Sequence, residues 1–68
     1  MTVGERIKEL RVFKKSMKKD EFAKAVGRKP LAIDSWEKDR SLPSLPSVDR
    51  MLKVFNMTYE EFMRGVEL

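Results

Sequence analysis

The strongest constraint on this chain lies in residues 19–36, where two helical apolar patterns flank a single tight turn. The apolar side chains on either side of the turn recur at the spacing of one face of an α-helix. They are Phe22, Ala23 and Val26 before the turn, and Ile33 and Trp36 after it. Gly27 lies between the two patterns and reaches positive φ without the strain that a Cβ atom causes. Residues 19–36 therefore predict two crossing helices with a shared buried face.

Basic residues concentrate around this stretch. Residues 1–40 contain twelve Lys/Arg and seven Asp/Glu, whereas residues 41–68 contain three and four. A surface with this excess of positive charge favours a polyanion as partner.

The residue types that are missing exclude several classes of function. The chain has no cysteine and no histidine, so the usual zinc ligands and the commonest general base are absent. No apolar run approaches the roughly 20 residues that span a membrane. We therefore expect a cytoplasmic protein that is not an enzyme and has no cofactor, no metal, no membrane contact and no small-molecule substrate.

Capping signals divide residues 1–68 into five short helices of one domain. Thr2 and Glu5 fit a capping box at the start of the first helix, and Thr58 and Glu61 fit another at the start of the last. Pro30 suits the first position of the third helix. The expected helices span residues 3 to about 15, 18–26, 30 to about 38, 44–56 and 58–65.

The first and fourth helices have apolar faces of their own. Val3, Ile7 and Leu10 share one face of the first helix, and Phe13 is a candidate to extend it. The fourth helix places these apolar residues on one face: Val48, Met51, Leu52 and Phe55. No strand-like alternation extends over a useful length, so the fold class is all-α.

Several features occur in order between residues 17 and 62, without a gap. They are Phe22-Ala23, Val26-Gly27, Ile33, Trp36-Glu37, Pro43-Ser44 and Asn56-Met57-Thr58. With them the chain resembles the lambda-repressor/Cro (XRE-like) family of helix-turn-helix domains over residues 3–65. The resemblance implies a compact five-helix lambda-repressor-like DNA-binding domain, with the helix-turn-helix at residues 18–38. It also implies that the second helix lies across the DNA backbone and the third enters the major groove.

The resemblance implies a set of DNA-binding residues in and after the two central helices. They are Lys18, Lys19, Arg28, Lys29, Pro30, Leu31, Asp34, Ser35, Lys38 and Arg40. Lys19 stands where the family usually has a glutamine that holds a phosphate. Pro30, Leu31 and Ser35 stand at base-edge positions, while Arg28, Lys29 and Arg40 stand near phosphates. Arg11 and Glu37 match a pair that is usually a structural salt bridge.

The chain departs from the family pattern on the outer face of the third helix. Leu31 could contact a thymine methyl and Ser35 could bond to any base, but bidentate base readers such as Gln, Asn or Arg are missing. Asp34 would repel phosphates unless it accepts from cytosine N4 or pairs with Lys38 at i+4.

Two further departures concern the helix ends. Lys18 and Lys29 replace the Ser or Thr expected as caps of the second and third helices. Bound phosphate could compensate, or for the second helix the carboxylates of Asp20 and Glu21 could do so. The segment between residues 11 and 17 is also one residue longer than in the family pattern.

Two functions remain open. The leading hypothesis is a sequence-specific DNA-binding transcriptional regulator of phage or mobile-element repressor/Cro type, which binds double-stranded DNA as a weak homodimer on paired half-sites. The residues available for self-association are Tyr59, Phe62, Met63, Val66 and Leu68, although Tyr59 and Phe62 could instead pack in the core. The alternative is a helix-turn-helix protein-binding modulator or antirepressor that docks onto a partner repressor, because a protruding Pro30-Leu31 pair beside Asp34 resembles a small protein interface.

Overall fold

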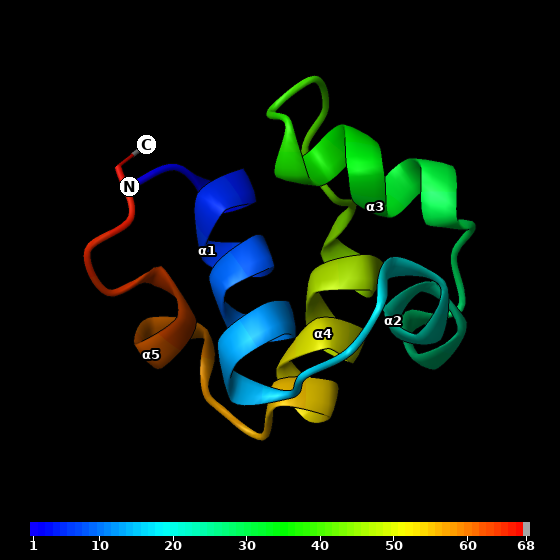
Figure 1. Cartoon of the computed structure of the whole chain (residues 1–68). Coiled ribbons are helices and arrows are strands. Elements are labelled where there is room, and N and C mark those ends of the chain that lie inside the picture. The colour runs from blue at the N-terminus through cyan, green and yellow to red at the C-terminus, as the bar shows by residue number, and fades with distance from the viewer. Residues whose placement is uncertain (68) are drawn as a thin grey trace.

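Five helices follow one another in the computed structural model, which describes residues 1–67, and no strand occurs in that range (Figure 1). They are α1 (Val3–Glu9), which continues as the π-helical turn η1 (Leu10–Lys14), then α2 (Lys19–Val26), α3 (Pro30–Glu37), α4 (Leu45–Phe55) and α5 (Tyr59–Met63). This is the all-α five-helix fold that the sequence predicts. Each helix boundary lies within about two residues of its expected position, and α5 ends before Gly65.

The predicted caps form. The Thr2 hydroxyl accepts from the Glu5 N–H at 3.1 Å, and the Glu5 carboxylate accepts from the Thr2 N–H at 2.7 Å. Thr58 and Glu61 repeat this arrangement at α5, and the Ser44 hydroxyl caps α4. Because these bonds satisfy N–H groups that a helix leaves unpaired, they fix where three of the five helices begin.

One apolar core joins α1, α2, α3, α4 and α5. Its buried members are Ile7, Leu10, Phe22, Ala23, Val26, Ile33, Trp36, Met51, Phe55 and Phe62. The rings of Phe22 and Phe55 stack with centroids 5.2 Å apart and so hold α2 against α4. The inner face predicted for residues 19–36 is therefore confirmed.

The last turn of the first helix is wider than an α-helical turn. The Lys15 N–H donates to the carbonyl of Leu10, five residues back, at 3.1 Å. A π turn accommodates one residue more than an α turn, and this turn includes the first residues of the segment that we expected to be one residue longer than the family pattern. It also shifts the angular position of the side chains that follow Leu10. Phe13 is 82% exposed, so the expectation that it extends the buried face was wrong.

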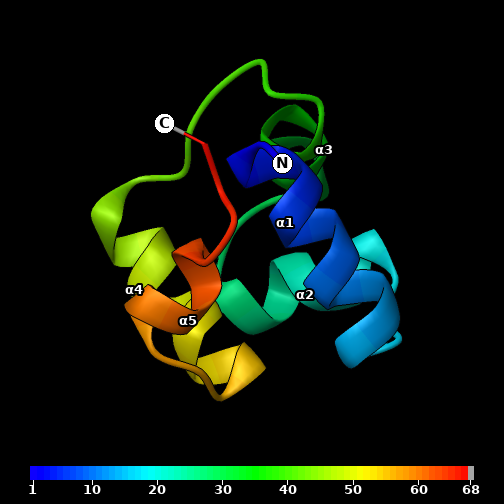
Figure 2. The same cartoon turned by 90° about the vertical axis from the view of Figure 1, so that its left-hand side faces the viewer.

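The two chain ends lie side by side. The amino group of Met1 donates to the carbonyl of Gly65 at 3.1 Å, and the Glu67 N–H donates to the carbonyl of Met1 at 2.8 Å. Figure 2 shows the N-terminal segment and the segment after α5 running next to each other. Among the residues considered for self-association, Leu68 lies outside the described residues.

Candidate nucleic-acid interface

The turn between α2 and α3 depends on Gly27. Its φ is 71°, and the next residue, Arg28, donates its N–H to the carbonyl of Ala23 at 2.8 Å, which ends α2. A Cβ atom on Gly27 would also collide with the guanidinium of Arg50, which donates to the carbonyl of Val26 at 3.3 Å. Position 27 therefore favours glycine for its backbone conformation, while a Cβ atom would only displace the flexible end of the Arg50 side chain.

The starts of α2 and α3 differ in their electrostatics. At α2 the Glu21 carboxylate accepts from the Lys18 N–H at 2.9 Å, and Asp20 lies in the same turn. At α3 the backbone of Lys29 is extended, Pro30 occupies the first helical position, and no acidic residue lies in the first turn. The carboxylate compensation expected for α2 is therefore present, whereas α3 begins with only positive charge around its dipole.

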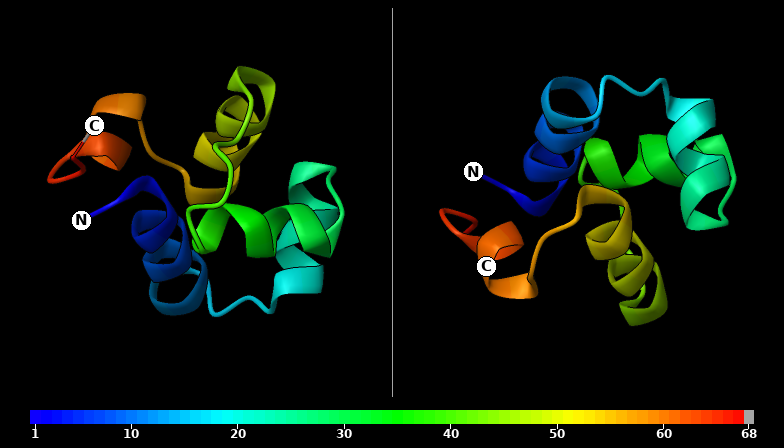
Figure 3. Two further views of the ribbon diagram at one scale, coloured as in Figure 1. Left: turned by 90° about the horizontal axis from the view of Figure 1, so that it is seen from above. Right: turned by 90° about the horizontal axis from the view of Figure 1, so that it is seen from below.

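The ten predicted DNA-binding residues lie on α2, on α3 and in the segments beside them, and we call this surface the outer face. Its exposed members are Lys18, Arg28, Lys29, Pro30, Leu31, Lys38 and Arg40, and its partly buried members are Lys19, Asp34 and Ser35. Figure 1 shows α3 at the upper edge of the molecule, and the view from above in Figure 3 shows that no other helix covers it. The structure thus leaves the outer face open to a partner.

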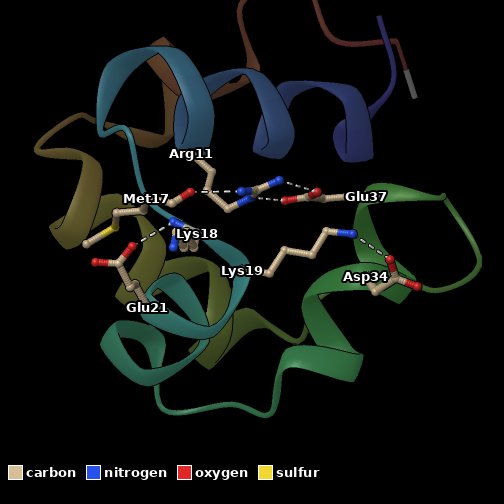
Figure 4. Close-up of polar contacts among 7 residues, drawn as sticks. All are labelled: Arg11, Met17, Lys18, Lys19, Glu21, Asp34 and Glu37. Carbon is tan, nitrogen blue, oxygen red and sulfur yellow. Dashed lines mark hydrogen bonds and ion pairs between the residues drawn. The ribbon is translucent and has the colours of Figure 1, made fainter.

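Asp34 pairs with two of the lysines of the outer face. Its Oδ1 lies 2.7 Å from the Nζ of Lys19, and its Oδ2 lies 3.0 Å from the Nζ of Lys38. Figure 4 shows the Lys19 side chain reaching from α2 to the carboxylate on α3. The hydrogen bonds from Lys19 and then Lys38 lower the pKa of Asp34 to about 2. The i+4 pair with Lys38 confirms one of the alternatives for Asp34, while the Lys19 pair was not foreseen.

Ser35 is also engaged within the protein. Its hydroxyl lies 2.7 Å from the hydroxyl of Ser41, in the loop after α3, and either group can donate. Ser41 was not predicted, because a lone serine in a polar loop gives no signal of its partner. The bond ties the loop to α3 and limits the rotamers of Ser35.

A buried ion pair fixes α3 against the first helix (Figure 4). The Nε and Nη2 of Arg11 lie 2.6 and 3.0 Å from the two carboxylate oxygens of Glu37, and its Nη1 donates to the carbonyl of Met17 at 2.8 Å. The two side chains are 8% and 3% exposed. The structural role predicted for this pair is confirmed, and it holds α3 and the segment before α2 in one arrangement.

A family model described as helix-turn-helix, of the lambda-repressor-like (XRE-like) kind, matches residues 7–62. This chain belongs to that helix-turn-helix family. The family consists of DNA-binding regulators, so the chain carries a helix-turn-helix that binds double-stranded DNA. A comparison with curated protein sequences finds no match.

In this helix-turn-helix domain, α1 approaches α3 closely at a glycine. The Asp39 carboxylate accepts from the Thr2 hydroxyl at 2.8 Å and from the Gly4 N–H at 3.1 Å. A Cβ atom on Gly4 would lie 2.6 Å from that carboxylate and closer still to the carbonyl of Trp36. The contact anchors the end of α3, and sequence reasoning missed it because Gly4 and Asp39 carry no pairing signal.

Two general findings concern other kinds of site. Within residues 1–67, no group of three or more His, Cys, Asp or Glu side chains is placed to hold a metal ion. In the same part of the helix-turn-helix domain, no helix has the length and apolar character needed to cross a membrane.

Proposed function

We propose that this protein is a sequence-specific transcriptional regulator of the phage or mobile-element repressor/Cro type, with α3 in the major groove of its DNA site. The observation that carries the proposal is the outer face itself. The side chain of Leu31 is 77% exposed on α3, beside basic side chains at the preceding turn. A helix that presents its outer side uncovered and flanked by cations suits a polyanionic groove.

The proposed contacts divide into two kinds. Four cations of the outer face form no ion pair with any residue in 1–67 and would contact phosphates: Lys18, Arg28, Lys29 and Arg40. Pro30 and Leu31 would meet base edges, with Leu31 against a thymine methyl. Ser35 would accept from a base if its proton is donated to Ser41, or donate to a base if Ser41 is the donor. Phosphate contacts would position the domain and base contacts would specify the site.

Pairing on two half-sites would depend on a weak interface near α5. Tyr59 is 54% exposed and can take part, whereas Phe62 is buried in the core and cannot without unfolding α5. Met63 and Val66 are partly buried. This small apolar set supports weak self-association, or assembly of two copies on DNA.

Salt dependence tests the phosphate contacts. A labelled duplex of mixed sequence is titrated with protein between about 50 and 200 mM salt. Four phosphate contacts give a slope of log affinity against log salt of about −3.6, since each contributes roughly −0.9. Lys29→Ala should make the slope shallower by about 1, whereas Lys53→Ala, an exposed lysine on α4, should leave it unchanged. No binding at the lowest salt would refute the proposal.

Base reading needs its own test. Selection from a library of random duplexes should enrich one motif, and each wrong base pair in it should cost about 1–3 kcal/mol. Leu31→Ala should relax the preference at a thymine position while it leaves the salt slope unchanged. Enrichment of no motif would refute sequence specificity and leave backbone binding intact.

A protein-binding modulator is the second candidate, and one observation favours it. Leu31 borders a shallow, largely apolar hollow together with Ala32 and Trp36, a setting that suits an apolar anchor from a partner repressor. In that case Leu31→Asp would abolish binding to the repressor protein, whereas Lys19→Ala, at a residue that does not line the hollow, would not. If DNA binding carries the function, Lys29→Ala weakens duplex binding and no repressor protein is required.

A further inference from the structure

The carboxylate of Asp34 connects the two edges of the outer face. One oxygen takes the ammonium of Lys19, from the first turn of α2, and the other takes that of Lys38, at the end of α3. The Asp34 side chain is 21% exposed, compared with 41% and 52% for the two lysines. We call this arrangement the Asp34 clamp. Its single negative charge offsets one of the two positive charges that would otherwise be free on both sides of the outer face.

We propose that Asp34 is a specificity-determining residue, because its carboxylate competes with DNA phosphates for Lys19 and Lys38 and so weakens binding to DNA of any sequence. This inference rests on the proposed function. A phosphate that approaches either lysine finds the ammonium already hydrogen-bonded to an anion, and it is repelled by that anion as well. Base contacts are unaffected by this competition, so a larger share of the remaining affinity depends on sequence.

The position of Asp34 on α3 supports competition. Asp34 follows Leu31 by three residues, so both lie on the same side of the helix. Its side chain has no polar contact within residues 1–67 other than those with the two lysines, so no structural bond of the core depends on it. The carboxylate therefore stands at the surface where the duplex would approach and acts there on cations alone.

The competition predicts how many counterions DNA binding releases. Six cations belong to the outer face, and the clamp engages two of them. If all six contacted phosphates, the salt slope would approach about −5.4, compared with about −3.6 for four. The gain in affinity from two additional phosphate contacts is therefore about tenfold larger at 50 mM than at 200 mM salt.

The experiment compares two variants that remove one negative charge each. Asp34→Asn opens the clamp, whereas Asp49→Asn neutralises an exposed carboxylate on α4 that is in no ion pair within residues 1–67. Asp34→Asn should bind a mixed-sequence duplex more tightly than wild type, with a slope steeper by about 1 to 2, and the gain in affinity should be about tenfold larger at 50 mM than at 200 mM salt. Asp49→Asn should stay within about twofold of wild type, with the wild-type slope.

A second comparison isolates Lys19. Lys19→Met should weaken duplex binding by less than about twofold when Asp34 is present, because the clamp already occupies the ammonium. In the Asp34→Asn background the same change should weaken binding by at least about threefold, which is the salt contribution of one phosphate contact. Circular dichroism verifies that each variant folds, and Asp34→Ala repeats the test if the amide variant does not.

The outcomes separate this inference from the proposed function. If wild type and Asp49→Asn both fail to bind any duplex, the proposed function is wrong. If they bind and Asp34→Asn binds no more tightly than Asp49→Asn, only the competition is wrong. Weaker binding of Asp34→Asn to G·C duplexes, with no change on A·T duplexes, would instead identify Asp34 as an acceptor for cytosine N4 and overturn the inference.

Discussion

Replacing one partner of the Arg11–Glu37 pair should cost more stability than replacing both. Glu37→Met leaves the guanidinium of Arg11 8% exposed, with the carbonyl of Met17 as its remaining partner. An uncompensated buried charge costs about 3–5 kcal/mol. At about 0.05–0.15 kcal/mol per residue, 68 residues have roughly 3–10 kcal/mol of stability in total. The single variant should therefore lose between about a third and all of its free energy of unfolding.

The double variant Arg11→Met/Glu37→Met should be more stable than either single variant. It leaves no buried charge, and the one polar group that loses its partner is the Met17 carbonyl, at a cost of about 1–3 kcal/mol. The coupling energy between the two positions should reach at least about 2 kcal/mol. Most of that value is the penalty of a lone buried ion, because a buried pair contributes little net stability beyond an apolar pair of similar volume.

Urea denaturation of the three variants measures this coupling. Trp36 is the only tryptophan and is buried, so its fluorescence reports unfolding together with far-UV circular dichroism. The slope of the free energy of unfolding against urea concentration should be the same for all variants, so that the midpoints report stability. Glu9→Met is the control, since it breaks a more exposed pair with Arg6 and should cost no more than about 1 kcal/mol. Single-variant losses that add to the double-variant loss within about 0.5 kcal/mol would refute the reasoning.

Three shorter predictions concern Gly4, Asp34 and Phe13. Gly4→Ala should lower the free energy of unfolding by about 2–3 kcal/mol, because its Cβ meets backbone and carboxylate atoms. Gly65→Ala has open space around it and should cost about 1–2 kcal/mol for its positive φ alone. Equal losses for the two variants in urea denaturation would contradict this reasoning. Carbon NMR should give Asp34 a pKa of about 2 rather than its ordinary 3.8. Because this pKa is lower in the folded than in the unfolded state, the stability that Asp34 adds is complete above about pH 4 and is lost as the pH falls towards 2. Phe13→Ser should change stability by less than about 0.5 kcal/mol, compared with about 3–5 kcal/mol for Phe22→Ala, and a large loss at position 13 would show that its ring is packed.

The inner face of the fold could be predicted from the sequence because it depends on local spacing. Phe22 and Ile33 lie on helical stripes that can face only one way once Gly27 turns the chain. Caps are equally local, since Thr2 and Thr58 bond to groups three residues away. Each of these signals depends on residues a few positions apart, so it can be recognised in a single sequence.

What could not be predicted depends on geometry between distant segments. Whether Phe13 is buried depends on the width of one helical turn, and no residue type announces a π turn. Arg6 donates to the carbonyls of Glu61 and Phe62 at the end of α5, each at 2.9 Å, across more than fifty residues. An arginine on an amphipathic helix gives no sign of such a partner, so the anchor between α1 and α5 becomes visible only in three dimensions.

The same limit applies to the outer face, with a consequence for how DNA would be recognised. The resemblance could assign Lys19 to a phosphate from its position, but the structure places the Asp34 carboxylate within hydrogen-bonding distance of both Lys19 and Lys38. The six cations of the outer face therefore overstate the attraction that this surface exerts on a polyanion, because two of them share the Asp34 carboxylate. With fewer phosphate contacts and few side-chain donors on α3, discrimination between DNA sites would depend on Leu31 against thymine methyls and on the shape of the duplex. A domain built in this way would bind weakly as a single copy and would need two half-sites for stable occupancy, since two linked weak contacts gain affinity without a new interaction.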